Sequence, residues 1–152
     1  MGWFVHGEQA TTEFQEYAEH SCAKHVVLTN LPIALVSFMA IQKKAPLVAV
    51  GHLAGAAAST IYHLDETNVK KYLWDQYMGL GGVATHVVHA FQTPRQKSFG
   101  WTIASAAMTA ALYHRSSQLW YKKKHHTAKY NMVHSMFHTA MALTGAVHLA
   151  TY

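Results

Sequence analysis

Five apolar stretches separated by short polar segments are the feature that most constrains how this chain can fold. They cover about residues 26–42, 46–64, 72–91, 99–114 and 132–152. Each approaches the ~20 residues that a helix needs to cross the hydrocarbon core of a bilayer, and none contains Lys or Arg before its very end. The pattern predicts an all-α integral membrane protein with about five transmembrane helices. The alternative is a soluble helical bundle.

Charged residues make up 12% of the 152-residue chain, against about 25% in a soluble domain. The mean hydropathy is near zero, so the membrane prediction rests on how the apolar residues are distributed. We expect residues 26–152 to form one helical membrane domain. Residues 1–25 form an N-terminal interfacial segment, in which Thr11 to Phe14 start a short amphipathic helix. This segment has neither a signal-peptide nor a transit-peptide pattern, so we expect the spans to direct insertion.

The distribution of Lys and Arg predicts the orientation. Eight of the twelve fall on the side that holds the N-terminus, which places that side in the cytoplasm or the mitochondrial matrix. These eight are Lys24, Lys70, Lys71, Arg115, Lys122, Lys123, Lys124 and Lys129. The run from Lys122 to His126 is typical of a solvated loop touching anionic lipid headgroups. A pI of 9.4 therefore needs no nucleic-acid partner to explain it.

Five polar residues are candidates for a metal site on that same side. Ser59 and His63 lie four residues apart and share one helix face, as do His134 and His138, while Asp75 begins the third stretch. The predicted topology puts all five at one membrane depth. A catalytic zinc site uses three protein ligands and polar groups that hold a water. The pattern therefore predicts such a site.

Each of these residues also has an ordinary explanation. A serine in an Ala-rich helix often only packs against a neighbouring helix. A His pair four residues apart also arises by chance in a chain with 13 histidines. The order and shared depth of the residues, more than any single motif, favour a zinc site.

The same segments resemble the CREST superfamily of membrane hydrolases and receptors. That superfamily includes the alkaline ceramidases, the adiponectin and progestin receptors, and a transmembrane-8 branch with myomaker and a GPI-anchor phospholipase. The resemblance is strongest to the transmembrane-8 branch and covers the first three stretches and the last, about two-thirds of the chain. The segments are Leu28 to Pro32 through Lys43-Lys44, Ser59 to His63, Asp75 to Gly79, and His134 to His138.

The resemblance implies roles for the five residues. His63, His134 and His138 would bind Zn²⁺, and Ser59 and Asp75 would hold the water that the metal activates. The implied reaction is hydrolysis of an amide or ester bond in a membrane lipid, with Asp75 as the general base. Members of the superfamily typically have seven spans. Loss of two helices keeps the direction of the last one, so we expect the site to survive, whereas the substrate cavity would lose part of its wall.

Two further classes of function stay open. His52, His86, His89 and His148 also lie in apolar stretches, and two facing histidines can bind the iron of a b-type haem. Alternatively, the many small residues fit a non-catalytic accessory subunit, held by other subunits of a large membrane complex such as a respiratory one, with the metal kept as a structural element. The expected membrane is the mitochondrial inner membrane or that of the endoplasmic reticulum or Golgi.

Overall fold

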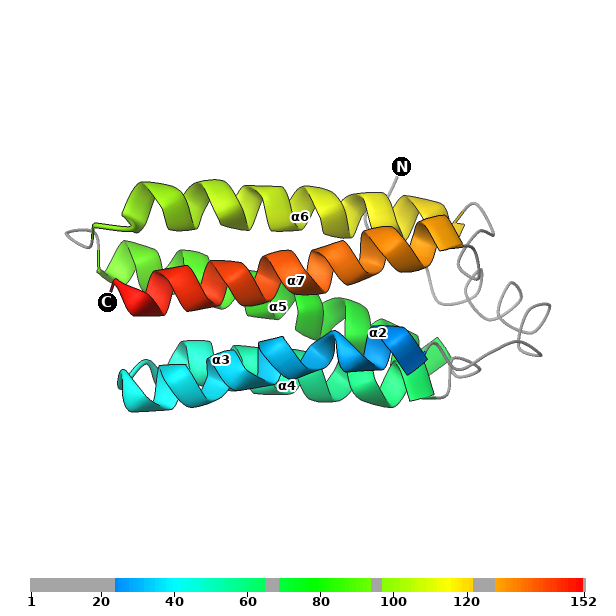
Figure 1. The fold of residues 1–152 in the computed structure, drawn as a ribbon, viewed down its shortest axis with the longest axis horizontal. Helices are drawn as coiled ribbons and strands as arrows, with labels where there is room; N and C mark the ends of the chain where they lie inside the picture. Colours follow the sequence, from blue (N-terminus) through cyan, green and yellow to red (C-terminus); the bar gives the residue numbers. More distant parts are fainter. Residues whose placement is uncertain (1–23, 65–68, 94–96, 122–127, 152) are drawn as a thin grey trace.

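The structure, a computed structural model, describes residues 24–64, 69–93, 97–121 and 128–151. All the regular structure in these ranges is helical, which confirms the all-α prediction (Figure 1). The expected amphipathic helix and the basic run from Lys122 to His126 lie outside the described residues. The helices are α2 (Lys24–Leu28), α3 (Asn30–Gln42), α4 (Pro46–Leu64), α5 (Val69–Gln92), α6 (Phe99–Tyr121) and α7 (Ala128–Ala150).

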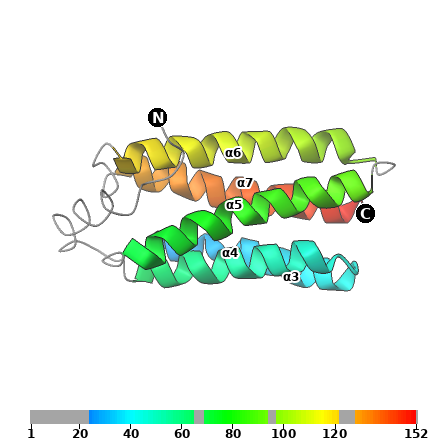
Figure 2. The ribbon, with the colours of Figure 1, turned by 180° about the vertical axis from the view of Figure 1, so that it is seen from behind.

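The long helices form an antiparallel bundle in which each packs on the next. The last helix, α7, packs on α3 and α5 as well as on α6, so it contacts the first long helix of the bundle (Figures 1 and 2). We call end A the end where α4 finishes and where α3, α5 and α7 begin, and end B the opposite one. Residues from the first and last helices therefore meet inside the bundle.

The first apolar stretch is one rod with a break at Thr29. Pro32 has no N–H to donate to the carbonyl of Leu28, four residues earlier, and its ring crowds that carbonyl. The backbone instead forms a tight turn, in which the N–H of Thr29 donates to the carbonyl of Val26 at 3.1 Å. This break places the Thr29 side chain toward the inside of the bundle at end A.

At end B, α3 ends in a turn in which Lys44 adopts a left-handed backbone conformation. Lys44 has a φ of 55°, in the left-handed region. The N–H of Ala45 donates to the carbonyl of Ala40 at 2.8 Å, and that of Lys44 to Ile41 at 3.0 Å, which together satisfy the last carbonyls of α3. Pro46 then starts α4, at a position where its missing N–H costs nothing.

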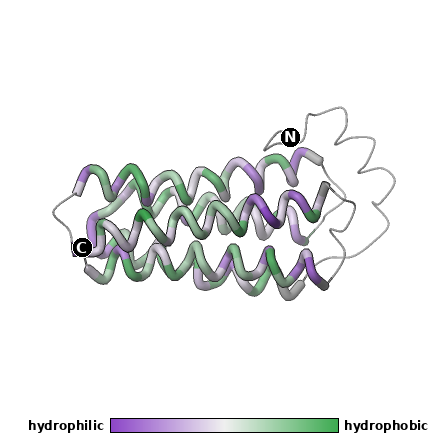
Figure 3. Tube along the Cα trace, turned by 90° about the horizontal axis from the view of Figure 1, so that it is seen from above, coloured by the Kyte–Doolittle hydropathy of each residue, from purple (hydrophilic) through white to green (hydrophobic). Residues whose placement is uncertain are grey.

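The bundle buries many polar side chains beside its apolar core and exposes many large apolar ones. On α3, Asn30 and Ser37 are buried, whereas Leu35 and Phe38 are each 62% exposed. Strongly hydrophilic residues lie mostly toward the helix ends, with hydrophobic ones along the length between (Figure 3). By length and composition, α4 is the one described helix able to cross a membrane, and Val26–Gln42 is a shorter apolar stretch.

Helix α6 is longer than the apolar stretch that predicts it. It continues past the expected end at residue 114 to Tyr121. The extension keeps the inward face of the helix, because Ser116 and Trp120 follow Tyr113 at helical spacing and all three are buried. This extra length brings α6 to the candidate site at end A.

Candidate metal centre

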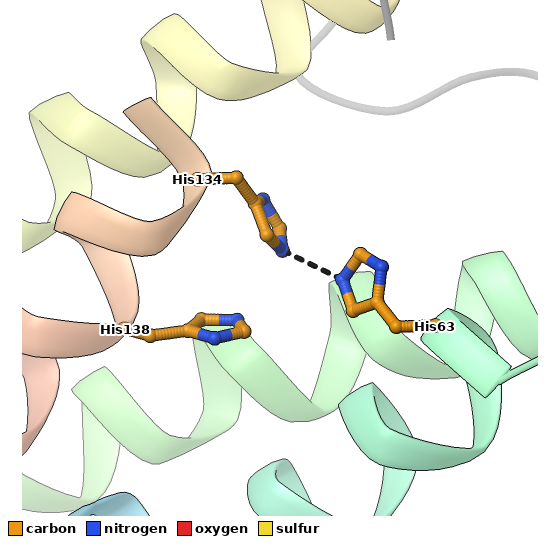
Figure 4. Close-up of side chains that lie close together, drawn as sticks. All are labelled: His63, His134 and His138. Atoms are coloured by element: carbon orange, nitrogen blue, oxygen red, sulfur yellow. Dashed lines mark hydrogen bonds between the residues drawn. The ribbon is translucent and has the colours of Figure 1, made fainter. Parts of the chain in front are cut away.

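Three histidines converge at end A of the bundle (Figure 4). His63 comes from the last turn of α4, and His134 and His138 from successive turns of α7. One nitrogen from each ring can be chosen so that all three lie within 4.8 Å of one another, and all three residues are buried. The Nε2 atoms of His63 and His134 are 3.0 Å apart. The predicted convergence is confirmed, and the group can hold a metal ion.

The ring of His138 is held in the orientation that a ligand needs. The hydroxyl of Thr29 donates to the carbonyl of Val26 at 2.6 Å, so its oxygen is left to accept. His138 Nδ1 lies 2.7 Å from that oxygen and therefore carries the proton that it donates. A neutral imidazole then has its lone pair on Nε2, the atom that faces the other two rings.

His134 has a similar partner on α6. Its Nδ1 lies 2.8 Å from the hydroxyl oxygen of Ser116, while its Nε2 faces His63. When Nε2 binds a metal, Nδ1 carries the proton and donates it to Ser116. Metal-ligating histidines usually have such a partner on the outer nitrogen, which fixes both tautomer and ring orientation. Thr29 and Ser116 thus support the two ligands of α7.

Ser59 and Asp75 lie against this group. The hydroxyl oxygen of Ser59 is 3.3 Å from His138 Nε2. Asp75 is buried on α5 and shares with His134 a small cavity of about 10 Å³. A cavity of this size has room for about one water molecule. The structure therefore brings the three histidines together, with Ser59 beside His138 and Asp75 in a cavity shared with His134.

Aromatic residues close the remaining sides of this cavity. Tyr130 stacks on His134, with ring centroids 5.3 Å apart, and Tyr72 stacks on Trp120 at 4.2 Å. All three aromatic side chains are buried, so they separate the centre from bulk water. A dry surrounding strengthens the electrostatic interactions of any charge that the centre binds.

The two hydroxyl partners, Thr29 and Ser116, were not predicted from the sequence. Thr29 directly precedes the kinked segment Asn30 to Pro32, which was a usable signal. Ser116 follows Arg115 and was assigned to a polar loop, although it continues the spacing of Thr109 and Tyr113 along α6. That spacing is the signal that could have placed it inside.

Comparison with known proteins adds no relative: no protein-family model matches this chain, and no curated protein and no solved structure is significantly similar to it.

Proposed function

We propose that this chain is a membrane-embedded zinc protein whose five long helices cross the bilayer. The observation that supports the membrane placement is the inverted distribution of polarity. A soluble bundle buries its large apolar side chains, whereas a chain surrounded by lipid exposes them and turns its polar groups inward. Large exposed apolar patches are uncommon on soluble monomers and mark interaction or membrane surfaces.

Helix α4 combines exposed large apolar side chains with buried polar ones, although its buried face also carries Val48, Ala49 and Ala56. Its outward face carries Val50 and Leu53, which are 66% and 56% exposed, and its inward face carries His52, Ser59 and His63, each 3% exposed or less. Between Val26 and Leu64 the only charged residues are Lys43 and Lys44, in the turn at end B. The same combination on α3 extends the apolar surface around the bundle. The large apolar residues at least 40% exposed on α3 and α4 are Leu31, Leu35, Phe38, Ile41, Leu47, Val50, Leu53, Ile61 and Leu64.

Zinc is the metal that the ligand set suits best. Among the described residues the group offers three imidazoles and no fourth protein ligand. This is the arrangement of catalytic zinc sites, in which one coordination position stays open. Imidazole nitrogen is a borderline ligand that suits Zn²⁺ better than the hard cations Mg²⁺ and Ca²⁺. When bound, zinc supplies Lewis acidity that polarises a carbonyl and lowers the pKa of water toward ~7.

The activity we propose is hydrolysis of an amide or ester bond in a membrane lipid. Asp75 takes the proton from a water held in the cavity that it shares with His134, and returns it to the leaving group. Ser59 does not line this cavity; its hydroxyl lies 3.3 Å from His138 Nε2, where it would hold a water on the side of the three histidines. A site within the bilayer border lets a lipid enter sideways. The resemblance of these segments to the CREST hydrolases supports the same chemistry.

The size of the cavity favours a second candidate, an accessory membrane subunit with a structural zinc. The space beside Asp75 is about 10 Å³, which holds a water but not a lipid carbonyl with its chains. The larger pocket, about 270 Å³, lies apart from the histidines, against α4 and α5. It is lined by Ala58, Ile61, Lys70, Lys71 and Trp74. A hydrolase must open the small cavity to its substrate, and a structural centre need not.

Asp75→Asn separates the two candidates. The full chain is purified in detergent, and zinc content and hydrolysis of ceramide and phospholipid substrates are measured together. For a hydrolase we expect Asp75→Asn to keep its zinc and to lose about 10²–10⁴-fold in turnover, the usual contribution of a general base. The control is His114→Gln, on α6, whose ring pairs with Gln118 away from the centre.

Three results are informative. Turnover that falls in Asp75→Asn but not in His114→Gln supports the hydrolase. Zinc without turnover in the wild type supports the structural subunit. A wild-type chain whose zinc content does not change in His134→Gln overturns the proposal that this centre binds zinc.

A further inference from the structure

A second group of four histidines lies inside the bundle at end B. His52 comes from α4, His86 and His89 from α5 and His148 from α7, and none is more than 6% exposed. His52 Nε2 lies 2.9 Å from His86 Nε2, and His89 Nδ1 lies 2.6 Å from His148 Nε2. The rings of His86 and His148 join the two pairs, with centroids 5.6 Å apart. We call these four residues the end-B group.

The hydrogen bonds of the first pair fix where its protons lie. His52 Nδ1 is 3.2 Å from the carbonyl oxygen of Val48, which can only accept, so this nitrogen carries the proton. In a neutral ring Nε2 of His52 then has the lone pair, and it accepts from the Nε2–H of His86. A positive charge on either ring would be costly in this dry interior, so His86 is neutral. Its proton is on Nε2, and its lone pair is therefore on Nδ1.

His86 Nδ1 is buried and has no hydrogen-bond partner. Buried polar atoms without a partner are rare, because each costs about 1–3 kcal/mol in lost solvation. This nitrogen carries the imidazole lone pair that binds transition metals. The hydrogen bond from His86 Nε2–H to His52 Nε2 fixes the orientation of the His86 ring. Metal-ligating histidines are held in this way by a partner on the other nitrogen.

His148 repeats the arrangement seen at end A. Its Nδ1 lies 3.0 Å from the hydroxyl of the buried Thr102 on α6, and its Nε2 faces His89. At end A, Ser116 on the same helix holds the outer nitrogen of His134. The ring centroids of His89 and His148 are 4.9 Å apart, the same separation as those of His63 and His134.

We propose that the end-B group is a second metal site, in which His86, His89 and His148 are the ligands and His52 is the outer partner that orients His86. This proposal does not depend on the function proposed for end A. An all-imidazole site suits a late first-row divalent ion, and Zn²⁺ is the probe of choice. With Zn–N bonds of 2.0–2.1 Å, tetrahedral ligands lie about 3.3 Å apart. Only the end-A group among the described residues has three ligand nitrogens within 4.8 Å of one another, so His86 must move toward His89 and His148 on binding, while the 2.6 Å pair opens.

The packing favours a bare ion over a haem. The two imidazole pairs are in direct nitrogen-to-nitrogen contact, so a porphyrin has no space between their rings. Helix α7 also packs closely against the end-B group at Gly145. A Cβ atom there would lie 3.0 Å from His52 Nε2 and 3.2 Å from His86 Cε1. The close approach of α7 leaves no room for a macrocycle.

Zinc stoichiometry of the full chain in detergent tests the proposal. We expect two zinc ions per chain in the wild type and in the control His114→Gln, and one in His134→Gln, which removes the end-A centre. Adding His86→Gln to His134→Gln should remove the second ion. Circular dichroism of each variant checks that the helices are retained.

Thr102→Val gives a variant that keeps all the ligands. We expect it to weaken zinc binding at end B by about 10–100-fold and to leave the end-A centre unchanged, because it removes only the partner of His148 Nδ1. If the wild type binds one zinc that His134→Gln abolishes and His86→Gln does not affect, the second site is overturned. One zinc that is lost in His86→Gln but not in His134→Gln supports the end-B site and overturns the end-A centre instead.

Discussion

The two histidine groups occupy opposite ends of one bundle and differ in how closely their nitrogens gather. At end A, ligand atoms from His63, His134 and His138 all lie within 4.8 Å of one another. In the described part of the chain this is the one group of three that meets that spacing. The end-B group is instead two contacting pairs, with an unpaired nitrogen on His86.

Both ligand sets take two rings from one helix and a third from another. His134 and His138 are four residues apart on α7, so one helix presents two rings on the same face to a third. His86 and His89 are three residues apart on α5, and the third ring comes from α7. We infer that end A is the more preorganised group and the tighter binding site, because less rearrangement is needed on binding.

The largest expected effect is the stabilisation of the folded chain by zinc. A site filled at 1,000 times its Kd adds about 4 kcal/mol, or roughly 8–16 °C in Tm for a chain of this size. We expect His138→Gln to lose most of this gain and His148→Gln to lose less, because the end-B group binds more weakly. Thermal unfolding in detergent, with zinc and after a chelator, measures both. Equal losses would remove the distinction between the two ends, and no response to zinc in the wild type would argue against both sites.

The next effect comes from the hydroxyl that orients His138. Thr29→Val keeps the side-chain shape but leaves His138 Nδ1 without its acceptor, so we expect zinc affinity at end A to fall about 10–100-fold, or about 1.4–2.7 kcal/mol. Competition with a zinc-binding dye measures the change. The matched control is Thr139→Val on α7, because the Thr139 hydroxyl is exposed and bonds the carbonyl of Ser135. An equal loss in both variants would mean that Thr29 does not support the ligand.

The helices and the three converging histidines at end A were predictable from the sequence. Apolar stretches give the helices directly, and spacings of four residues put Ser59 with His63 and His134 with His138 on shared faces. The alternation of helix direction then brings these faces to one end. These steps use only local periodicity and chain connectivity, which a sequence carries in full.

The partners of the histidines were not predictable in the same way. Thr29 meets His138 only because Pro32 breaks the helix and α3 packs on α7, more than 100 residues later. Ser116 meets His134 because α6 continues past Arg115. At end B the sequence left open a b-type haem bound by two of His52, His86, His89 and His148, and the direct contact of the rings within each pair argues against one. Such contacts depend on side-chain packing between helices, and hydroxyl groups are too common in the chain to mark their partners.

The smallest expected effect tests whether α7 must approach the end-B group closely. In Gly145→Ala the new Cβ would lie 2.5 Å from Val36 Cγ1 as well as against His52 and His86. Val36 is β-branched and cannot turn aside easily. We expect a loss of stability of about 1 kcal/mol, at the lower end of overpacking costs, and weaker zinc binding at end B alone. His138 is seven residues away along α7, about 10 Å, so end A should keep its affinity.

Gly81→Ala on α5 is the matched control for this substitution. Gly81 is exposed, and a Cβ there would meet nothing within 4 Å, so only the helix propensity changes. We expect a gain of about 0.5–1 kcal/mol, because alanine loses less backbone entropy than glycine in a helix. Unfolding and zinc titration of both variants separate steric contact from propensity. If Gly145→Ala leaves zinc binding at end B unchanged, the position of α7 does not control the His52–His86 pair, and the orientation of His86 must depend on α4 and α5 alone.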